Sequence, residues 1–214
     1  MTGKTHLLIG AAVGAAVAAS HSYGDDRAAL IVGVAGFSAL AADLDGTGML
    51  SSKLSKLSKL LREAALWGGI LFMAIVSYLF LAGQPVSPLL GLGGAAAFLL
   101  GLVMKQGFIR NALVSLVGIG FMYAGYESRM IWLIGFGLFV AWVPWLKHRG
   151  LTHTVWAVPI WAAIAWGLER QLGAEGVMEA AALGYLSHLV ADTLTPSGVK
   201  WLYPIVKKSF KIRL

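Results

Sequence analysis

Eight apolar segments follow one another along this chain, with only short polar connections between them. Several are shorter than the ~20 residues with which a helix crosses a bilayer comfortably, and they are rich in glycine and alanine, which favours close helix packing. The pattern predicts an all-α, polytopic membrane helix bundle of about eight hydrophobic helices, some of them short or half-spanning. The segments cover roughly residues 5–20, 28–42, 66–83, 88–104, 109–125, 130–146, 153–168 and 177–191.

The composition agrees with a membrane protein and excludes other classes. Hydrophobic residues make up 58% of the chain and charged residues 13%, whereas soluble domains have about 45–50% and about 25%. A soluble globule, a disordered chain and a coiled coil are all excluded by these values. Because the chain has no cysteine, any metal ion must be bound by histidine, aspartate or glutamate.

The distribution of basic residues predicts the orientation in the membrane. With a cytoplasmic N-terminus and eight alternating spans, only three of the 17 Lys and Arg residues fall outside, namely Arg27, Arg129 and Arg170. This asymmetry follows the positive-inside rule. We therefore expect a multi-pass protein of the cell inner membrane with both termini cytoplasmic. The basic residues would contact anionic headgroups of membrane lipids, and we expect no nucleic acid as the main ligand.

No long linker interrupts the chain, so residues 1–214 are expected to form a single membrane-embedded domain. Residues 51–65 place leucines and cations at helical spacing, which is typical of an amphipathic helix lying in the interface; a docking surface for a partner is the alternative. Residues 193–214 would form a basic cytoplasmic tail. The first apolar segment also has features of a cleaved signal peptide, but His6 favours its retention.

Seven ionisable residues lie at the ends of predicted spans, all on the side assigned to the cytoplasm. An ionisable group at membrane depth costs several kcal/mol unless it is paired or coordinated, so each is a candidate functional residue. Because one membrane level holds all of them, we predict a shared metal site. The candidate ligands are His6, Asp43, Asp45, His148, His153, His188 and Asp192.

The spacing within two of these pairs has geometric consequences. His188 and Asp192 are four residues apart, so both face the same side of a helix; a hydrogen-bonded pair without metal is the alternative. Asp43 and Asp45 are two residues apart. At this spacing the two side chains point in different directions on a helix but point to the same side in an extended turn. Gly46 makes such a turn plausible.

The remaining pair suggests more than one ion. His148 and His153 share an ion only if the chain breaks near Gly150; otherwise they serve two neighbouring ions. Imidazole and carboxylate suit Zn²⁺ best, with Mn²⁺ or Fe²⁺ as alternatives, and seven ligands favour two or three ions. Such ions would polarise a phosphoryl oxygen and activate water. Asp43 or Asp45 would bridge the ions or act as the catalytic base.

Two cations near these motifs are candidates for binding an anionic substrate. Arg149, next to His148, offers a guanidinium fork to an anionic group, although anchoring on the cytoplasmic side explains it equally well. Lys200 lies in the tail, where its alternative role is to anchor headgroups.

Four motifs make the chain resemble the YdjM-type family, described as LexA-regulated inner-membrane proteins and predicted metal-dependent hydrolases. They cover about a fifth of the chain: Gly3-Lys-Thr-His6-Leu-Leu, Asp43-Leu-Asp45, His148-Arg-Gly-Leu-Thr-His153-Thr, and Gly184-Tyr-Leu-Ser-His188-Leu-Val-Ala-Asp192-Thr-Leu-Thr-Pro-Ser-Gly-Val. The family is considered distantly similar to the helical zinc-dependent phospholipases C and single-strand nucleases. The resemblance implies a zinc cluster held by His6, one of Asp43 and Asp45, His148, His153, His188 and Asp192.

The chain departs from the family pattern at two places. Family members usually continue the Asp-x-Asp motif with a histidine, where this chain has Gly46, which implies one ligand fewer. Compared with shorter relatives, residues 66–146 would be inserted spans between the acidic motif and the His-Arg-Gly motif.

Three functions agree with these features. The first is a membrane-embedded metal-dependent hydrolase, most simply a phosphoesterase, acting on a lipid or another small amphiphilic phosphate at the cytoplasmic leaflet. The second is a metal-binding transporter, which requires ionisable groups along a path through the membrane; the span interiors contain few. The third is a non-catalytic scaffold with a structural metal, whose coordination would be saturated. The oligomeric state cannot be derived from the sequence.

Overall fold

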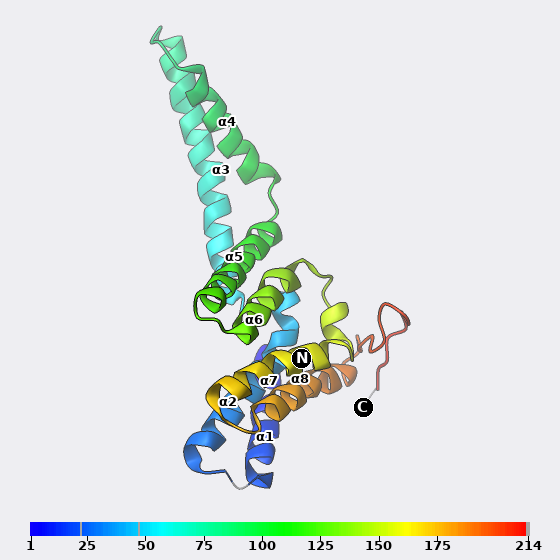
Figure 1. Ribbon diagram of the computed structural model, residues 1–214. Coiled ribbons are helices and arrows are strands. Elements are labelled where there is room, and N and C mark those ends of the chain that lie inside the picture. The colour runs from blue at the N-terminus through cyan, green and yellow to red at the C-terminus, as the bar shows by residue number, and fades with distance from the viewer. Residues whose placement is uncertain (22, 47, 213–214) are drawn as a thin grey trace. The chain divides into compact units, whose positions relative to one another are not determined.

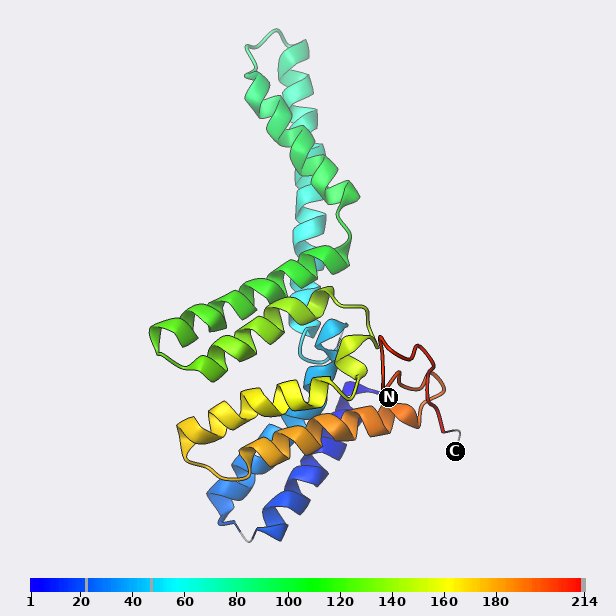
Figure 2. The same cartoon turned by 45° about the vertical axis from the view of Figure 1, so that its right-hand side comes forward.

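The structure is a computed structural model that describes residues 1–21, 23–46 and 48–212, and helices dominate this part of the chain (Figures 1 and 2). The all-α helical membrane bundle predicted from the sequence is confirmed. Arg213, part of the predicted basic tail, lies outside the described residues. The helices are α1 (Gly3–Ser20), α2 (Asp25–Ala41), α3 (Ser52–Leu81), α4 (Pro88–Val103), α5 (Gln106–Glu127), α6 (Ile131–Trp142), α7 (Ala157–Leu172) and α8 (Val177–Thr193).

Three helical stretches among the described residues are long and apolar enough to cross a membrane: Asp25–Asp45, Ser52–Leu81 and Gly107–Glu127. The apolar stretches Pro88–Val103 and Ile131–Trp145 are shorter. Large apolar side chains face outward, with Leu8 70% and Leu116 62% exposed, while several ionisable side chains are buried, namely His6, Asp45, His153, His188 and Asp192. This inverted distribution suits a chain surrounded by lipid, because hydrocarbon solvates leucine well and ionisable groups poorly.

The chain divides into two compact units. The larger unit consists of Met1–Ser51 and Val114–Leu214, and the smaller unit of Ser52–Leu113. In the smaller unit, α3 packs along α4. The predicted amphipathic segment 51–65 and the span after it form the single helix α3. No glycine or proline lies between Ser52 and Gly68 to end the helix. The prediction of one domain stays a prediction.

In the larger unit, α2 lies against both α1 and α8, and α8 also packs on α7 (Figure 2). Glycines permit the closest approaches. A Cβ on Gly10 of α1 would meet the Ala39 side chain of α2 at 2.5 Å, and a Cβ on Gly184 of α8 would clash with the Ala35 carbonyl oxygen of α2. Larger residues would separate these helices. The contacts therefore align the start of α1 with the ends of α2 and α8.

The segment between α6 and α7 is not α-helical. A 3₁₀ helix, Val143–Trp145, follows α6 and contains Pro144, which cannot continue an α-helix with normal hydrogen bonding. A second 3₁₀ helix, Leu151–His153, precedes α7, so that α7 begins at Ala157, later than the apolar pattern indicates. The break at Gly150, which sequence analysis gave as the condition for His148 and His153 to share a site, is therefore present.

Candidate metal centre

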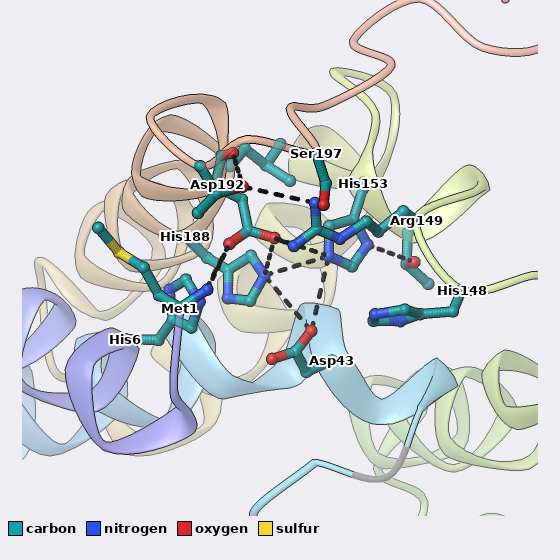
Figure 3. A network of polar contacts seen from close by, with 12 residues as sticks. Met1, His6, Asp43, His148, Arg149, His153, His188, Asp192 and Ser197 are labelled. Atoms are coloured by element: carbon teal, nitrogen blue, oxygen red, sulfur yellow. Dashed lines mark hydrogen bonds and ion pairs between the residues drawn. The ribbon is translucent and has the colours of Figure 1, made fainter. Parts of the chain in front are cut away.

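All seven predicted ligands come together at one end of the larger unit, and Figure 3 labels all of them except Asp45. His6 comes from the first turns of α1, and Asp43 and Asp45 from the 3₁₀ helix Ala42–Asp45 that continues α2. The other four come from the α6–α7 segment and the last turns of α8. Three overlapping groups have ligand atoms within 4.8 Å of one another: His6, Asp43 and His188; His153, His188 and Asp192; and Asp43, Asp45 and His148.

Four of these atoms form what we call the central group: Nε2 of His153, Nε2 of His188, Oδ1 of Asp43 and Oδ2 of Asp192. The two Nε2 atoms are 3.2 Å apart, and Asp43 Oδ1 lies 3.6 Å from each of them. Asp192 Oδ2 lies 3.7 Å from His153 Nε2 and 3.9 Å from His188 Nε2. The oxygen-to-nitrogen distances are too long for hydrogen bonds.

Hydrogen-bond partners fix the protonation of both central imidazoles. His188 Nδ1 lies 2.7 Å from the carbonyl oxygen of Ala39. Since a carbonyl only accepts, Nδ1 carries the proton and donates it, which leaves a lone pair on Nε2 of the neutral ring.

His153 is oriented in the same way through a hydroxyl group. Thr152 Oγ1 donates to Asp45 Oδ2 at 2.6 Å, so at its 3.0 Å contact with His153 Nδ1 it accepts the ring proton. The Nδ1 atom of His153 therefore also carries a proton, which leaves Nε2 as the nitrogen that can bind a metal ion. Such hydrogen bonds from the far ring nitrogen typically orient metal-binding histidines.

The residues fit a divalent cation. Two lone pairs facing each other at 3.2 Å repel one another unless a positive charge lies between them. Two nitrogens bound to one tetrahedral Zn²⁺, at the usual bond length of about 2.0–2.1 Å, would be about 3.3 Å apart. The central group thus has the donor types and the spacing that zinc requires.

His6 also has a ring nitrogen without a hydrogen-bond partner among the described residues. Its ring stacks on that of His188, with the centroids 3.9 Å apart, and its Nε2 lies 3.3 Å from Asp192 Oδ1. The Nδ1 atom is buried and has no hydrogen-bond partner among the described residues. A buried imidazole nitrogen without a partner is costly, which makes His6 a further candidate ligand.

The two aspartates of the acidic motif point to different partners. The prediction that they converge in an extended turn differs from the structure, because a 3₁₀ helix has about three residues per turn and separates positions two apart. Asp45 has a fully buried side chain and uses both oxygens: Oδ1 accepts from His148 Nδ1 at 2.7 Å and Oδ2 accepts from Thr152. Asp43 is directed at the central group instead.

His148 lies at the solvent edge of the centre. Its side chain is 52% exposed, and the hydrogen bond to Asp45 raises the pKa of His148 above its usual value. The ring also lies next to Gly46, because a Cβ on Gly46 would lie 3.1 Å from His148 Nδ1. The space next to position 46 is therefore filled by the ring of His148.

Arg149 connects the centre to the tail. It has a φ of 58°, a conformation uncommon for residues other than glycine. Its Nη2 lies 3.1 Å from Asp192 Oδ2, and Nη1 donates to the carbonyl oxygen of Gly198 at 3.1 Å. Lys200, the other predicted substrate-binding residue, makes no ion pair with the cluster in the described part of the chain.

Sequence reasoning missed the residues that hold the ligands in place. Thr152 links Asp45 to His153, and Tyr185 donates from its hydroxyl to the Thr152 carbonyl oxygen at 2.7 Å. Both lie inside motifs that carry the family resemblance, and their place in these motifs is the sequence feature that could have identified them. The carbonyl group of Ala39, which fixes His188, gives no signal in the sequence.

The fold and the cluster define an integral membrane protein whose helix bundle encloses a histidine–aspartate centre at one end. The chain belongs to the YdjM inner membrane protein family, whose model matches residues 1–214. The resemblance inferred from the four motifs is confirmed, and the family places the protein in the inner membrane. Searches of the curated proteins and of the solved structures found no match. The number of passes and the orientation of the termini stay predictions.

Proposed function

We propose that this protein is a membrane-embedded, metal-dependent hydrolase of phosphoric esters, acting on a lipid or another amphiphilic phosphate at the cytoplasmic leaflet. The observation that carries the proposal is the pair of facing Nε2 atoms of His153 and His188, 3.2 Å apart between two carboxylates. Zinc is the best match for these donors, with Mn²⁺ or Fe²⁺ as alternatives. The three overlapping ligand groups leave room for two or three ions.

Each residue has a distinct part in this proposal. His153, His188, Asp43 and Asp192 would hold the cation, with His6 beside them. When bound, such a cation supplies Lewis acidity toward a phosphoryl oxygen and activates water. Asp43 is the better candidate for a catalytic carboxylate, since its side chain is 21% exposed whereas that of Asp45 is fully buried. Asp45 acts as a positioning residue through Thr152 and His148.

Metal-dependent turnover tests the proposal directly. We expect detergent-purified protein to contain a divalent metal by elemental analysis and to hydrolyse bis(p-nitrophenyl) phosphate or phosphatidylglycerol. Chelation should abolish hydrolysis, and added Zn²⁺ should restore it. A protein free of divalent metal, or hydrolysis that survives chelation, contradicts the proposal. Full metal occupancy without turnover of either ester favours the scaffold, and passage of the cation into liposomes favours the transporter.

Arg149 would hold a phosphate oxygen of the substrate beside the centre. Its guanidinium has five N–H donors, and the contacts with Asp192 and Gly198 leave some of them for a ligand. We expect Arg149→Lys to lower kcat/KM by about 100-fold, because one donor to the developing charge is lost, while the metal content stays unchanged. Elemental analysis and kinetics on the same sample measure both values.

The matched control for this substitution is Arg170→Lys. Arg170 stacks over the ring of Trp166 in α7 and does not touch the centre, so its replacement should leave kcat/KM as in the wild type. If metal content and kcat/KM fall together in Arg149→Lys, then Arg149 only holds Asp192 in place, and its proposed contact with the substrate is wrong.

A further inference from the structure

An apolar groove adjoins the metal centre within the larger unit. This α6–α7 groove has a volume of about 200 Å³. Leu138 and Phe139 of α6 form one wall, and Ile160 of α7 contributes to the other. At one end the lining includes Thr152 and Thr154, the residues on either side of His153. His153 itself is fully buried and does not line the groove, but the hydroxyl group of Thr152 contacts His153 Nδ1 at 3.0 Å, so the groove wall is in direct contact with a side chain of the central group.

Two tryptophans indicate the depth of this end of the groove. Trp142 and Trp156 both line it and are 57% and 46% exposed. Exposed tryptophans favour the level of the lipid headgroups, where the indole ring meets both water and hydrocarbon. The remaining walls, from Phe139 to Ile164, are hydrocarbon and aromatic carbon. A ligand in the groove would therefore have its polar end near His153 and its apolar part deeper in the membrane.

A larger cavity of about 420 Å³ lies between α2, α6 and α7 but does not share this property. None of the seven candidate ligands lines either space, but the lining of the larger cavity also lacks the two threonines beside His153. Ser38, a polar residue in its wall, already accepts a hydrogen bond from Trp161 Nε1 at 2.9 Å. What distinguishes the α6–α7 groove is Thr152, which lines it and contacts both Asp45 and His153.

We infer that the α6–α7 groove binds an acyl chain of the substrate, which makes the substrate a long-chain phospholipid whose phosphate lies beside His153. This inference rests on the proposed hydrolase function. A hydrocarbon chain is the appropriate occupant, because water would find almost no polar partner along these walls. An acyl chain bound in the groove would position the phosphate group at the metal centre. The length of the acyl chain would therefore affect turnover as well as affinity.

Gly135 of α6 offers a selective way to fill the groove. It lies in the groove lining, and a Cβ there would meet only the Ile164 side chain, at an ordinary 3.5 Å. Gly135→Leu should therefore be accommodated and occupy the space of the chain. Gly120→Leu is the matched control: Gly120 lies in α5, has open space at its Cβ position and lines neither of these cavities.

Photolabelling tests the groove without requiring catalysis. Wild-type protein in vesicles that contain phosphatidylglycerol with a diazirine in one acyl chain should form adducts at Leu138 and Ile160. Gly135→Leu should lose these adducts, and Gly120→Leu should keep them. If adducts at the groove are no more frequent than at Leu116, which is 62% exposed on α5, only surrounding lipid is being labelled and the inference is wrong.

Hydrolysis of long-chain and short-chain phosphatidylglycerol separates this inference from the proposed function. We expect preference for the long chain in the wild type and loss of that preference in Gly135→Leu. Metal-dependent hydrolysis that is insensitive to chain length and unchanged in Gly135→Leu overturns the groove assignment alone. Groove adducts without any metal-dependent hydrolysis overturn the proposed function, and with it the role of the bound chain as substrate.

Discussion

Replacing His188 by asparagine is expected to remove metal from the protein while the helix bundle stays folded. The amide nitrogen of asparagine matches the position of Nδ1 and can still donate to the Ala39 carbonyl oxygen, which His188 Nδ1 does at 2.7 Å. What the substitution removes is Nε2, the atom opposed to Nε2 of His153 at 3.2 Å. The variant thus separates the proposed ligand atom from the hydrogen bond that packs the ring.

Two measurements follow this variant. Elemental analysis should find metal in the wild type and almost none in His188→Asn. Thermal unfolding in detergent should show a wild-type Tm about 5–10 °C higher with metal than after chelation, since a ligand at 100 times its Kd adds about 2.7 kcal/mol. The Tm of His188→Asn should not change on chelation. Bound metal in the variant at the wild-type level would show that His188 is not a ligand.

His21 provides the control for this experiment. It lies just after α1, stacks on Tyr23 and is half exposed, so His21→Asn should bind metal as the wild type does. A wild-type protein that contains no divalent metal, and whose Tm does not change on chelation, would contradict the metal centre as a whole.

The fold could be predicted from the sequence because its signal is local. An apolar segment in a membrane forms a helix to satisfy its own backbone hydrogen bonds, so the eight apolar segments correspond closely to α1–α8. The boundaries differ where no local residue ends or starts a helix. α3 extends back to Ser52 through residues without glycine or proline. α7 begins only at Ala157, because the 3₁₀ helix Leu151–His153 precedes it.

The membership of the site was also predictable, since an unpaired ionisable group is costly in a membrane and few of them occur in this chain. The roles within the site were not. Asp43 and Asp45 are the same residue type two positions apart, and the 3₁₀ helix alone decides which of them faces the central group. The contribution of Thr152 depends on a contact with Asp45 across 107 residues of sequence.

The substitutions Asp43→Asn and Asp45→Asn are expected to differ in their effects on stability and on metal affinity, although the chemical change is the same. Asp43 is partly exposed and contacts the central Nε2 atoms at 3.6 Å, too far for hydrogen bonds. Its replacement should cost little folding stability and lower metal affinity by at least about 100-fold, more than the loss of an outer hydrogen-bond partner. Activity should fall with the metal content.

For Asp45 we expect a larger loss of folding stability and a smaller loss of metal affinity, because its buried carboxylate accepts hydrogen bonds from both His148 and Thr152. An asparagine there turns one acceptor into a donor that faces another donor, which should destabilise the fold by about 1–3 kcal/mol and weaken metal binding by about 10- to 100-fold. Chemical unfolding and metal titration of both variants measure the two effects. Equal loss of stability in both variants, or tighter metal binding in Asp43→Asn than in Asp45→Asn, would reverse the assignment of ligand and positioning residue.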